Sequence, residues 1–248
     1  MINNQNIFRQ LPLEFELRND MGREDYMVSK CNENAFKLVD SWPQWFGSGL
    51  FIYGPKGCGK SHLAHLFADK VRALATKPVS VKIIDAAAVN MRNVKRLAEE
   101  NIAIVVENVL PRNNSEALFH LFNLFNVSGK YMLWTAETAP NKMNFGLKDL
   151  QTRLNMLPRA AISEPDDFML QMLIVKLFND RQLIVSPEIV NYIINNAPRS
   201  FEYIEKVVDE TDKISLAYKS AVNYTIIRQA MESIMLRDNR EPDLFEDF

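Results

Sequence analysis

A glycine-rich segment that ends in lysine and serine has the most specific chemistry in the sequence. Residues 54–61 (GPKGCGKS) fit the phosphate-loop pattern G-x-x-x-x-G-K-[ST] at every fixed position. Glycines let the backbone curl so that successive N–H groups point at phosphate oxygens. In this pattern Lys60 binds the β- and γ-phosphates, and the hydroxyl of Ser61 binds Mg²⁺. The candidate nucleotide-binding residues are Gly54, Pro55, Lys56, Gly57, Cys58, Gly59, Lys60, Ser61 and the adjacent His62.

A second polar site follows the apolar run 102–106, which ends in Glu107 and Asn108. Phosphate-loop enzymes place an acid at the end of a neighbouring strand to hold Mg²⁺. Glu107, where an aspartate is usual, is therefore a candidate metal ligand together with Ser61; the alternative is a solvated acid at a strand end. Asn108 stands where a base or a water-orienting acid is often found. Because an amide cannot take a proton at neutral pH, we expect weak or no ATP hydrolysis by this chain alone.

The elements that must position these residues alternate between strands and helices as far as residue 164. Short apolar runs predict buried strands, and apolar residues at helical spacing predict helices. We expect strands at 50–53, 79–84, 102–106, 131–135 and 160–162, with helices at 32–41, 60–75, 88–100, 115–127 and 147–156. This alternation predicts an α/β fold, a parallel sheet covered by helices on both faces. The phosphate loop would then join a strand to a helix, as the motif requires.

The pattern changes after Pro165, where the strands stop. Apolar periodicity predicts helices at 166–181, 186–196, 201–218 and 224–236, hence a small all-helical domain. We therefore expect four parts: a tail at 1–20, the α/β domain at 21–164, the helical domain at 165–236 and an acidic tail at 237–248.

The composition is that of an ordinary globular protein, with 248 residues, 47% hydrophobic and 24% charged. A net charge of −2 offers no bulk attraction to nucleic acid. One of the two cysteines, Cys58, lies inside the phosphate loop, which argues against a disulfide framework and favours a reducing cytosol. No run approaches the ~18 apolar residues of a membrane span, and no secretory signal is visible. We expect a cytoplasmic protein that does not bind membranes.

Taken together, the motifs resemble those of the AAA+ ATPases, more closely the DnaA-related branch with its Hda-like regulatory inactivators, over about residues 8–235. Tyr26 and Val28 lie in a segment that resembles the lining of the adenine pocket in that family. Residues 135–137 (TAE) lie at the sensor I position, where the glutamate departs from the family pattern. Residues 150–154 (LQTRL) resemble the segment with the arginine finger, Arg153, and 196–199 (NAPR) resemble sensor II, Arg199. The alternative for each arginine is an ordinary surface or salt-bridged residue.

Near the N-terminus, residues 10–15 (QLPLEF) resemble the peptide by which bacterial replication proteins bind the β sliding clamp of DNA polymerase III. Leu11, Leu13 and Phe15 are apolar anchors, and the amide of Gln10 can form directional hydrogen bonds. Pro12 favours an extended backbone. The alternative is that this segment packs on its own domain.

The resemblance implies a regulator of replication initiation that binds ATP or ADP with Mg²⁺. It would dock on the sliding clamp, pack against DnaA and place Arg153 in the nucleotide site of DnaA, stimulating hydrolysis there. A head-to-tail homo-oligomer is a further possibility, and sequence-specific DNA binding is not expected. Two alternatives stay open: an autonomous AAA+ ATPase such as a DnaC-like helicase loader, and a non-enzymatic clamp-binding adaptor.

Overall fold

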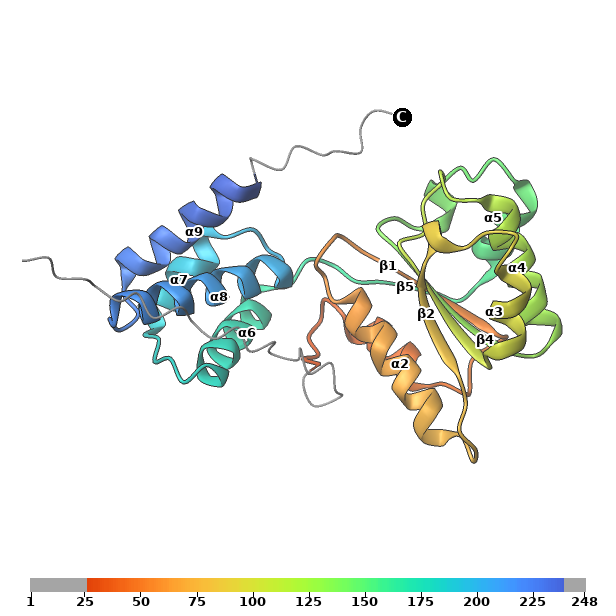
Figure 1. The fold of residues 1–248 in the computed structure, drawn as a ribbon, viewed down its shortest axis with the longest axis horizontal. Helices are drawn as coiled ribbons and strands as arrows, with labels where there is room; N and C mark the ends of the chain where they lie inside the picture. Colours follow the sequence, from red (N-terminus) through yellow and green to blue (C-terminus); the bar gives the residue numbers. More distant parts are fainter. Residues whose placement is uncertain (1–25, 239–248) are drawn as a thin grey trace, which may run out of the picture. The chain divides into compact units, whose positions relative to one another are not determined.

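The computed structural model describes residues 26–238, which form two compact units, 26–166 and 167–238 (Figure 1). Gln10, Leu11, Leu13 and Phe15 lie outside the described residues, as do residues 239–248.

The unit of residues 26–166 is built on a five-stranded sheet in which all neighbouring strands are parallel. The strands are β1 (Gly49–Tyr53), β2 (Val81–Asp85), β3 (Ala103–Glu107), β4 (Tyr131–Ala136) and β5 (Arg159–Ala161). Their order across the sheet is β2-β3-β4-β1-β5, so β1 lies between β4 and the edge strand β5. The predicted α/β class is confirmed.

Helices cover both faces of the sheet, because side chains of each strand alternate between two hydrophobic clusters (Figure 1). On one face α1 (Glu33–Asp40) and α2 (Lys60–Leu74) bury Leu63 and Phe67 against Ile52. On the other, α3 (Val94–Glu100), α4 (Ser115–Val127) and α5 (Lys148–Met156) share a cluster with Phe51 and Trp134. We refer to the first as the α2 face of the sheet.

One predicted helix is shorter than expected. Residues 88–100 were expected to be helical throughout, but the segment begins as a short 3-10 helix, Ala86–Ala88, and α3 starts only at Val94. Asparagine side chains cause the difference, since Asn93 accepts a hydrogen bond from the Asn90 backbone N–H at 3.0 Å and donates to the Ala88 carbonyl at 2.8 Å. Such local bonds compete with helical hydrogen bonding.

The unit of residues 167–238 is helical in all its regular structure. It contains α6 (Asp167–Asp180), α7 (Pro187–Asn196), α8 (Phe201–Tyr218) and α9 (Tyr224–Asp238), whose apolar faces are buried against one another. Glu210 on α8 is nearly buried and forms an ion pair with Arg237 on α9 at 2.7 Å, which joins the two longest helices of the unit. Within residues 26–238, no helix has the length and apolar character needed to cross a membrane.

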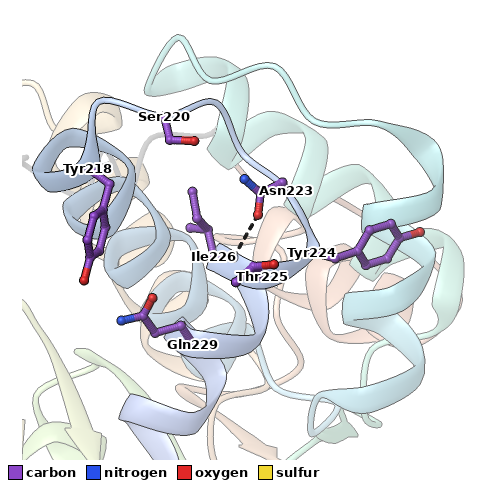
Figure 2. A pocket seen from close by; sticks show the side chains of 7 residues that line it. All are labelled: Tyr218, Ser220, Asn223, Tyr224, Thr225, Ile226 and Gln229. Carbon is purple, nitrogen blue, oxygen red and sulfur yellow. Dashed lines mark hydrogen bonds between the residues drawn. The ribbon is translucent and has the colours of Figure 1, made fainter.

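A shallow pocket of about 620 Å³ lies where α8 ends and α9 begins (Figure 2). Its lining is Tyr218, Ser220, Asn223, Tyr224, Thr225, Ile226 and Gln229. Asn223 accepts a hydrogen bond from the Ile226 backbone N–H at 3.1 Å, which starts α9 (Figure 2). No carboxylate, imidazole, amine or thiol lines this pocket, so it has no groups that suit acid–base catalysis near neutral pH.

Candidate nucleotide-binding site

The phosphate loop occupies residues 54–59, between the end of β1 and the start of α2. Gly57 and Gly59 have φ angles of +70° and +90°, in the left-handed region that a glycine adopts without strain. Gly54 is required for a different reason, because a Cβ atom there would lie 2.3 Å from the carbonyl oxygen of Ile162. That carbonyl is fixed beside the loop, since the Ile162 backbone N–H donates to the Tyr53 carbonyl at 2.7 Å.

Lys60 points into the loop rather than into solvent. Its side chain is buried, and Nζ donates hydrogen bonds to the carbonyl oxygens of Gly54 at 2.8 Å and Pro55 at 2.7 Å. Lys56, in the same loop, is exposed. A buried ammonium needs such acceptors, and no acidic side chain neutralises it within the described residues. The buried ammonium of Lys60 therefore lies where a phosphate-loop motif binds phosphate.

Cys58 is a packing residue of the loop. It is 1% exposed, and burial raises the pKa of its thiol. A neutral, buried thiol is unreactive, so Cys58 shapes the loop beside Lys60, whose Nζ lies 3.8 Å from its sulfur.

The strand ends beside the loop place polar side chains toward α2. On β3, Ala103 and Val105 pack in the cluster of the α2 face, so alternation directs Glu107 to that face as well. Ser61 lies at the start of α2 and is exposed. Hydroxyl and carboxylate oxygens suit Mg²⁺, and β3 is two strand spacings, about 10 Å, from β1. Ser61 would thus bind the ion directly, with Glu107 acting through water.

Protein ligands alone do not form a complete metal site here. Within residues 26–238, no group of three or more His, Cys, Asp or Glu side chains could hold a metal ion. With a bound nucleotide, Mg²⁺ is typically held by one or two protein groups together with water and phosphate oxygens.

Thr135, at the expected sensor I position, lies between Glu107 and the phosphate-loop strand. It follows Leu133 by two residues on β4, so it too faces α2, and it is opposite Ile52 of β1 in the register. Its hydroxyl is buried and has no hydrogen-bond partner among residues 26–238. Glu137, the departure from the family pattern, is exposed.

Asp85 is a polar residue at the strand ends that was not among the predicted site residues. The predicted strand 79–84 stops one residue before it. Asp85 is the last residue of β2 and pairs in register with Glu107. Its Oδ2 accepts a hydrogen bond from the side-chain amide of Asn108 at 2.7 Å. The available signal was an acid directly after a short apolar run, the same signal that identified Glu107.

The segment before α1 is fixed beside the start of α2. The Tyr26 ring stacks on Phe36, with centroids 5.6 Å apart, and meets the His62 ring edge-on at 5.0 Å. Burial of Tyr26 raises the pKa of its phenol. Val28 is 43% exposed, and so remains available to a ligand. The structure thus brings Tyr26 and His62 together, although contact of these residues with a nucleotide stays a prediction.

The two candidate arginines lie in different units. Arg153 is exposed in the last turn of α5, and within residues 26–238 its side chain forms no ion pair or hydrogen bond. Arg199 directly precedes Ser200, the N-cap residue of α8. Its guanidinium pairs with Asp167 of α6 at 2.5 Å. The predicted roles of both arginines at phosphate groups remain predictions.

No family model matches the sequence. An uncharacterized protein of Haemophilus influenzae is 23% identical over 232 residues, which cover 90% of this chain and 98% of that protein. The chromosomal replication initiator protein DnaA of Mycoplasma capricolum is 25% identical over 193 residues, covering 69% of this chain and 43% of DnaA. DnaA of Lachnoclostridium phytofermentans is 22% identical over 241 residues, covering 88% of this chain and 52% of DnaA. By sequence, this chain is therefore related to the DnaA proteins, at 22–25% identity.

Solved structures agree with this DnaA-related fold. Domain III of the Thermotoga maritima DnaA superposes with a TM-score of 0.75 at 18% identity, covering 92% of this chain and all of that domain. The AMPPCP-bound DnaA of Aquifex aeolicus has a TM-score of 0.66 at 17% identity, covering 88% of this chain and 69% of that one. The chain spans about half the length of the DnaA relatives that it matches.

Proposed function

We propose that this DnaA-related chain binds ATP or ADP with Mg²⁺ and regulates chromosome replication initiation by stimulating ATP hydrolysis by DnaA. The single observation on which the proposal depends is the phosphate loop, in which Lys60 is buried and, among residues 26–238, bound only to carbonyl oxygens and sulfur. Phosphate oxygens are stronger partners for an ammonium than neutral carbonyls. Nucleotide binding by the similar AMPPCP-bound DnaA supports the same use of this loop.

A regulatory role fits better than independent turnover, because the polar residue after Glu107 is an amide. A general base contributes about 10²- to 10⁴-fold to proton-transfer steps, and Asn108 cannot act as one. The chain would then hold its nucleotide as a structural and signalling ligand while DnaA performs hydrolysis.

Arg153 is the proposed group that acts on DnaA. In the described part of the chain, no acid pairs with the Arg153 guanidinium at this exposed helix end. It can therefore enter the nucleotide site of a second protein without first breaking an ion pair there. An arginine supplied in trans to a γ-phosphate contributes about 10³- to 10⁵-fold in related phosphoryl transfers. Lys148, an exposed cation in the first turn of the same helix, is the matched control.

Recruitment would depend on Gln10, Leu11, Leu13 and Phe15, which we propose bind the DNA polymerase III β sliding clamp. This brings the chain to DnaA near replicating DNA without a sequence-specific DNA contact.

The deciding experiment is the rate of ATP hydrolysis by cognate DnaA, with clamp loaded on DNA, in the presence and absence of this chain. We expect stimulation by the unaltered chain and by Lys148→Ala. Arg153→Ala should return DnaA to its unstimulated rate while nucleotide and clamp binding persist. The double change Gln10→Ala with Leu13→Ala should remove the part of the stimulation that depends on the clamp. Any stimulation measured without clamp should be unchanged. Stimulation that survives Arg153→Ala would exclude the proposed arginine role, and no stimulation by the unaltered chain would exclude DnaA as its target.

A further inference from the structure

The short turn 219–223, which joins α8 to α9, lies between two exposed tyrosines of the helical unit. Tyr218 at the end of α8 is 64% exposed, and Tyr224 at the start of α9 is 50% exposed. Both line the shallow pocket, and Figure 2 shows them on opposite sides of it. Tyr192 of α7 meets the Tyr224 ring edge-on, with 5.5 Å between the ring centroids. The turn thus presents two flat aromatic surfaces on which the rings of a ligand can stack.

Hydrogen-bonding groups without a partner line the same pocket. The side chains of Thr225 and Gln229, one turn apart on α9, are exposed and form no hydrogen bond within residues 26–238 (Figure 2). Asn223 is different, because its side chain accepts from the Ile226 backbone N–H and donates to the Ala221 carbonyl, both at 3.1 Å. A primary amide such as that of Gln229 both donates and accepts, so it can pair with the edge of any nucleic-acid base.

The charge along this part of the chain is positive, although the whole chain has a net charge of −2. Residues 213–231 contain three basic residues and no Asp or Glu, whereas 31 of all 248 residues are acidic. Arg228 pairs with Glu232 at 2.9 Å, but Lys219, directly after the first tyrosine, is exposed and forms no ion pair in the described part of the chain. An unpaired cation beside stacking rings suits a ligand whose rings are joined by phosphates.

The backbone conformation of Lys219 is one that glycine adopts more easily. Lys219 is the C-cap residue of α8, with a φ of +49° and a ψ of +42°, where glycine is the usual residue. A Cβ atom is strained in this left-handed region, and the attraction of a cation to the helix C-terminus offsets only part of that strain. The exposed ammonium is therefore what a lysine adds here beyond the requirements of the fold.

We infer that the α8–α9 turn binds single-stranded nucleic acid, with bases stacked on Tyr218 and Tyr224 and a phosphate beside Lys219. Two separated rings around an open, shallow pocket suit linked bases better than one enclosed small molecule. A duplex does not fit, because its bases stack on one another and do not expose their faces. Stacking tolerates every base, so no sequence preference is expected. The site belongs to residues 167–238 and does not depend on the phosphate loop or on the proposed action on DnaA.

Fluorescence anisotropy of labelled oligo(dT) and oligo(rU), each about 15 nucleotides long, tests the inference with the full chain. We expect a Kd on the order of 10⁻⁵ M at about 50 mM salt for the unaltered chain. Tyr218→Ala with Tyr224→Ala should raise this Kd at least about tenfold, because both stacking surfaces are lost. Tyr218→Phe with Tyr224→Phe is the matched control, since it keeps both rings and should bind within about threefold of the unaltered chain.

Lys219→Gly separates binding from stability. It should raise the Kd by about threefold to tenfold and reduce the dependence of log Kd on log salt by about 0.7, the value for one phosphate contact on a single strand. Its unfolding temperature should be equal to or above that of the unaltered chain, because glycine suits the left-handed backbone. Gln182→Gly, at another non-glycine residue with positive φ (+58°), should likewise keep the unfolding temperature and should leave the Kd unchanged.

The outcomes decide between this site and other uses of the turn. Lost binding in the alanine pair and retained binding in the phenylalanine pair, with both variants folded by thermal unfolding, would support the inference. The tighter of oligo(dT) and oligo(rU) would then identify the strand as DNA or RNA. No binding of either strand by the unaltered chain, equal binding by the alanine pair, or equally tight binding of a duplex would each overturn it.

Discussion

At the scale of single residues, the two lysines of the phosphate-loop motif differ in burial and therefore in expected function. Lys60 is buried on backbone carbonyls, whereas Lys56 is exposed. A hydrogen bond to a charged group contributes about 1.5–3 kcal/mol. The first lysine therefore provides a buried positive charge for phosphate, and the second adds at most a screened surface charge.

Lys60→Ala should raise the Kd for an ATP analogue by about tenfold to a hundredfold, following that energy. Lys56→Ala should change it by less than about threefold, because an exposed charge is screened by water and salt. Fluorescence titration at fixed ionic strength measures both. Equal effects of the two changes would contradict the assignment of Lys60 as the phosphate ligand.

At the scale of elements, the segment from Tyr26 to α1 is held by one buried amide. The side chain of Asn32 accepts from the Ser29 backbone N–H and donates to the Met27 carbonyl, both at 2.9 Å, and is 1% exposed. This fixes the backbone on either side of Val28, the part of the segment left open to a ligand.

Asn32→Ala should lower the free energy of unfolding by about 1–3 kcal/mol, because it leaves two backbone groups without partners in the interior. Asn93 is a matched control, since it also accepts one backbone N–H and donates to one carbonyl, but in an exposed loop. Asn93→Ala should cost clearly less in urea unfolding, because water replaces the lost partners. A similar loss for both asparagines would show that burial at Asn32 is not decisive.

In the helical unit, a partly buried carboxylate of α8 should make stability depend on pH. Burial, and then the charge of Asp209, raises the pKa of Glu205, while Arg181 opposes the shift. A carboxyl group whose folded pKa is raised stabilises the fold below its unfolded pKa, and this contribution is lost as pH rises through the folded pKa. Stability should therefore decrease from about pH 4 upward across that window.

Glu205→Gln should reduce this decrease, to which the pKa of Asp212, also raised by burial, contributes with the same sign. It should raise stability at pH 7 by less than about 1 kcal/mol, since solvent screens a partly exposed group. Thermal unfolding between pH 4 and pH 7 measures the effect. Glu100→Gln, at an exposed position on α3, is the control and should leave the pH dependence unchanged. The same slope with and without Glu205 would refute the assignment.

At the scale of the whole molecule, Arg199 is the residue through which we expect the helical unit to respond to a nucleotide on the phosphate loop. The proposed sensor residue Arg199 is paired with Asp167 inside its own unit. To reach a phosphate it must exchange an exposed ion pair, which is worth only about 0–1 kcal/mol. The ion pair with Asp167 by itself therefore opposes the exchange only weakly.

Amide hydrogen exchange around residues 199–204 should therefore slow when ATP and Mg²⁺ are added, and Arg199→Ala should abolish that slowing. Arg228→Ala, on α9 and paired with Glu232 at 2.9 Å, removes a similar exposed cation and should not. Slowing limited to residues 26–166 in the unaltered chain would mean that Arg199 does not sense the nucleotide.

The sequence by itself determined the phosphate loop, because its glycines, Lys60 and Ser61 act at fixed short spacing, and it determined the α/β class, because strand and helix periods are local. It also located Glu107 and Asn108, which follow an apolar run directly. Only the tertiary structure decided that Asp85 meets Asn108, since strand order sets neighbours that lie 23 positions apart. The same holds for Tyr26 and His62, whose contact depends on how two helices pack. Residues that act within one loop can be recognised from their spacing in the sequence. Residues that meet between strands can be recognised only once the strand order is known.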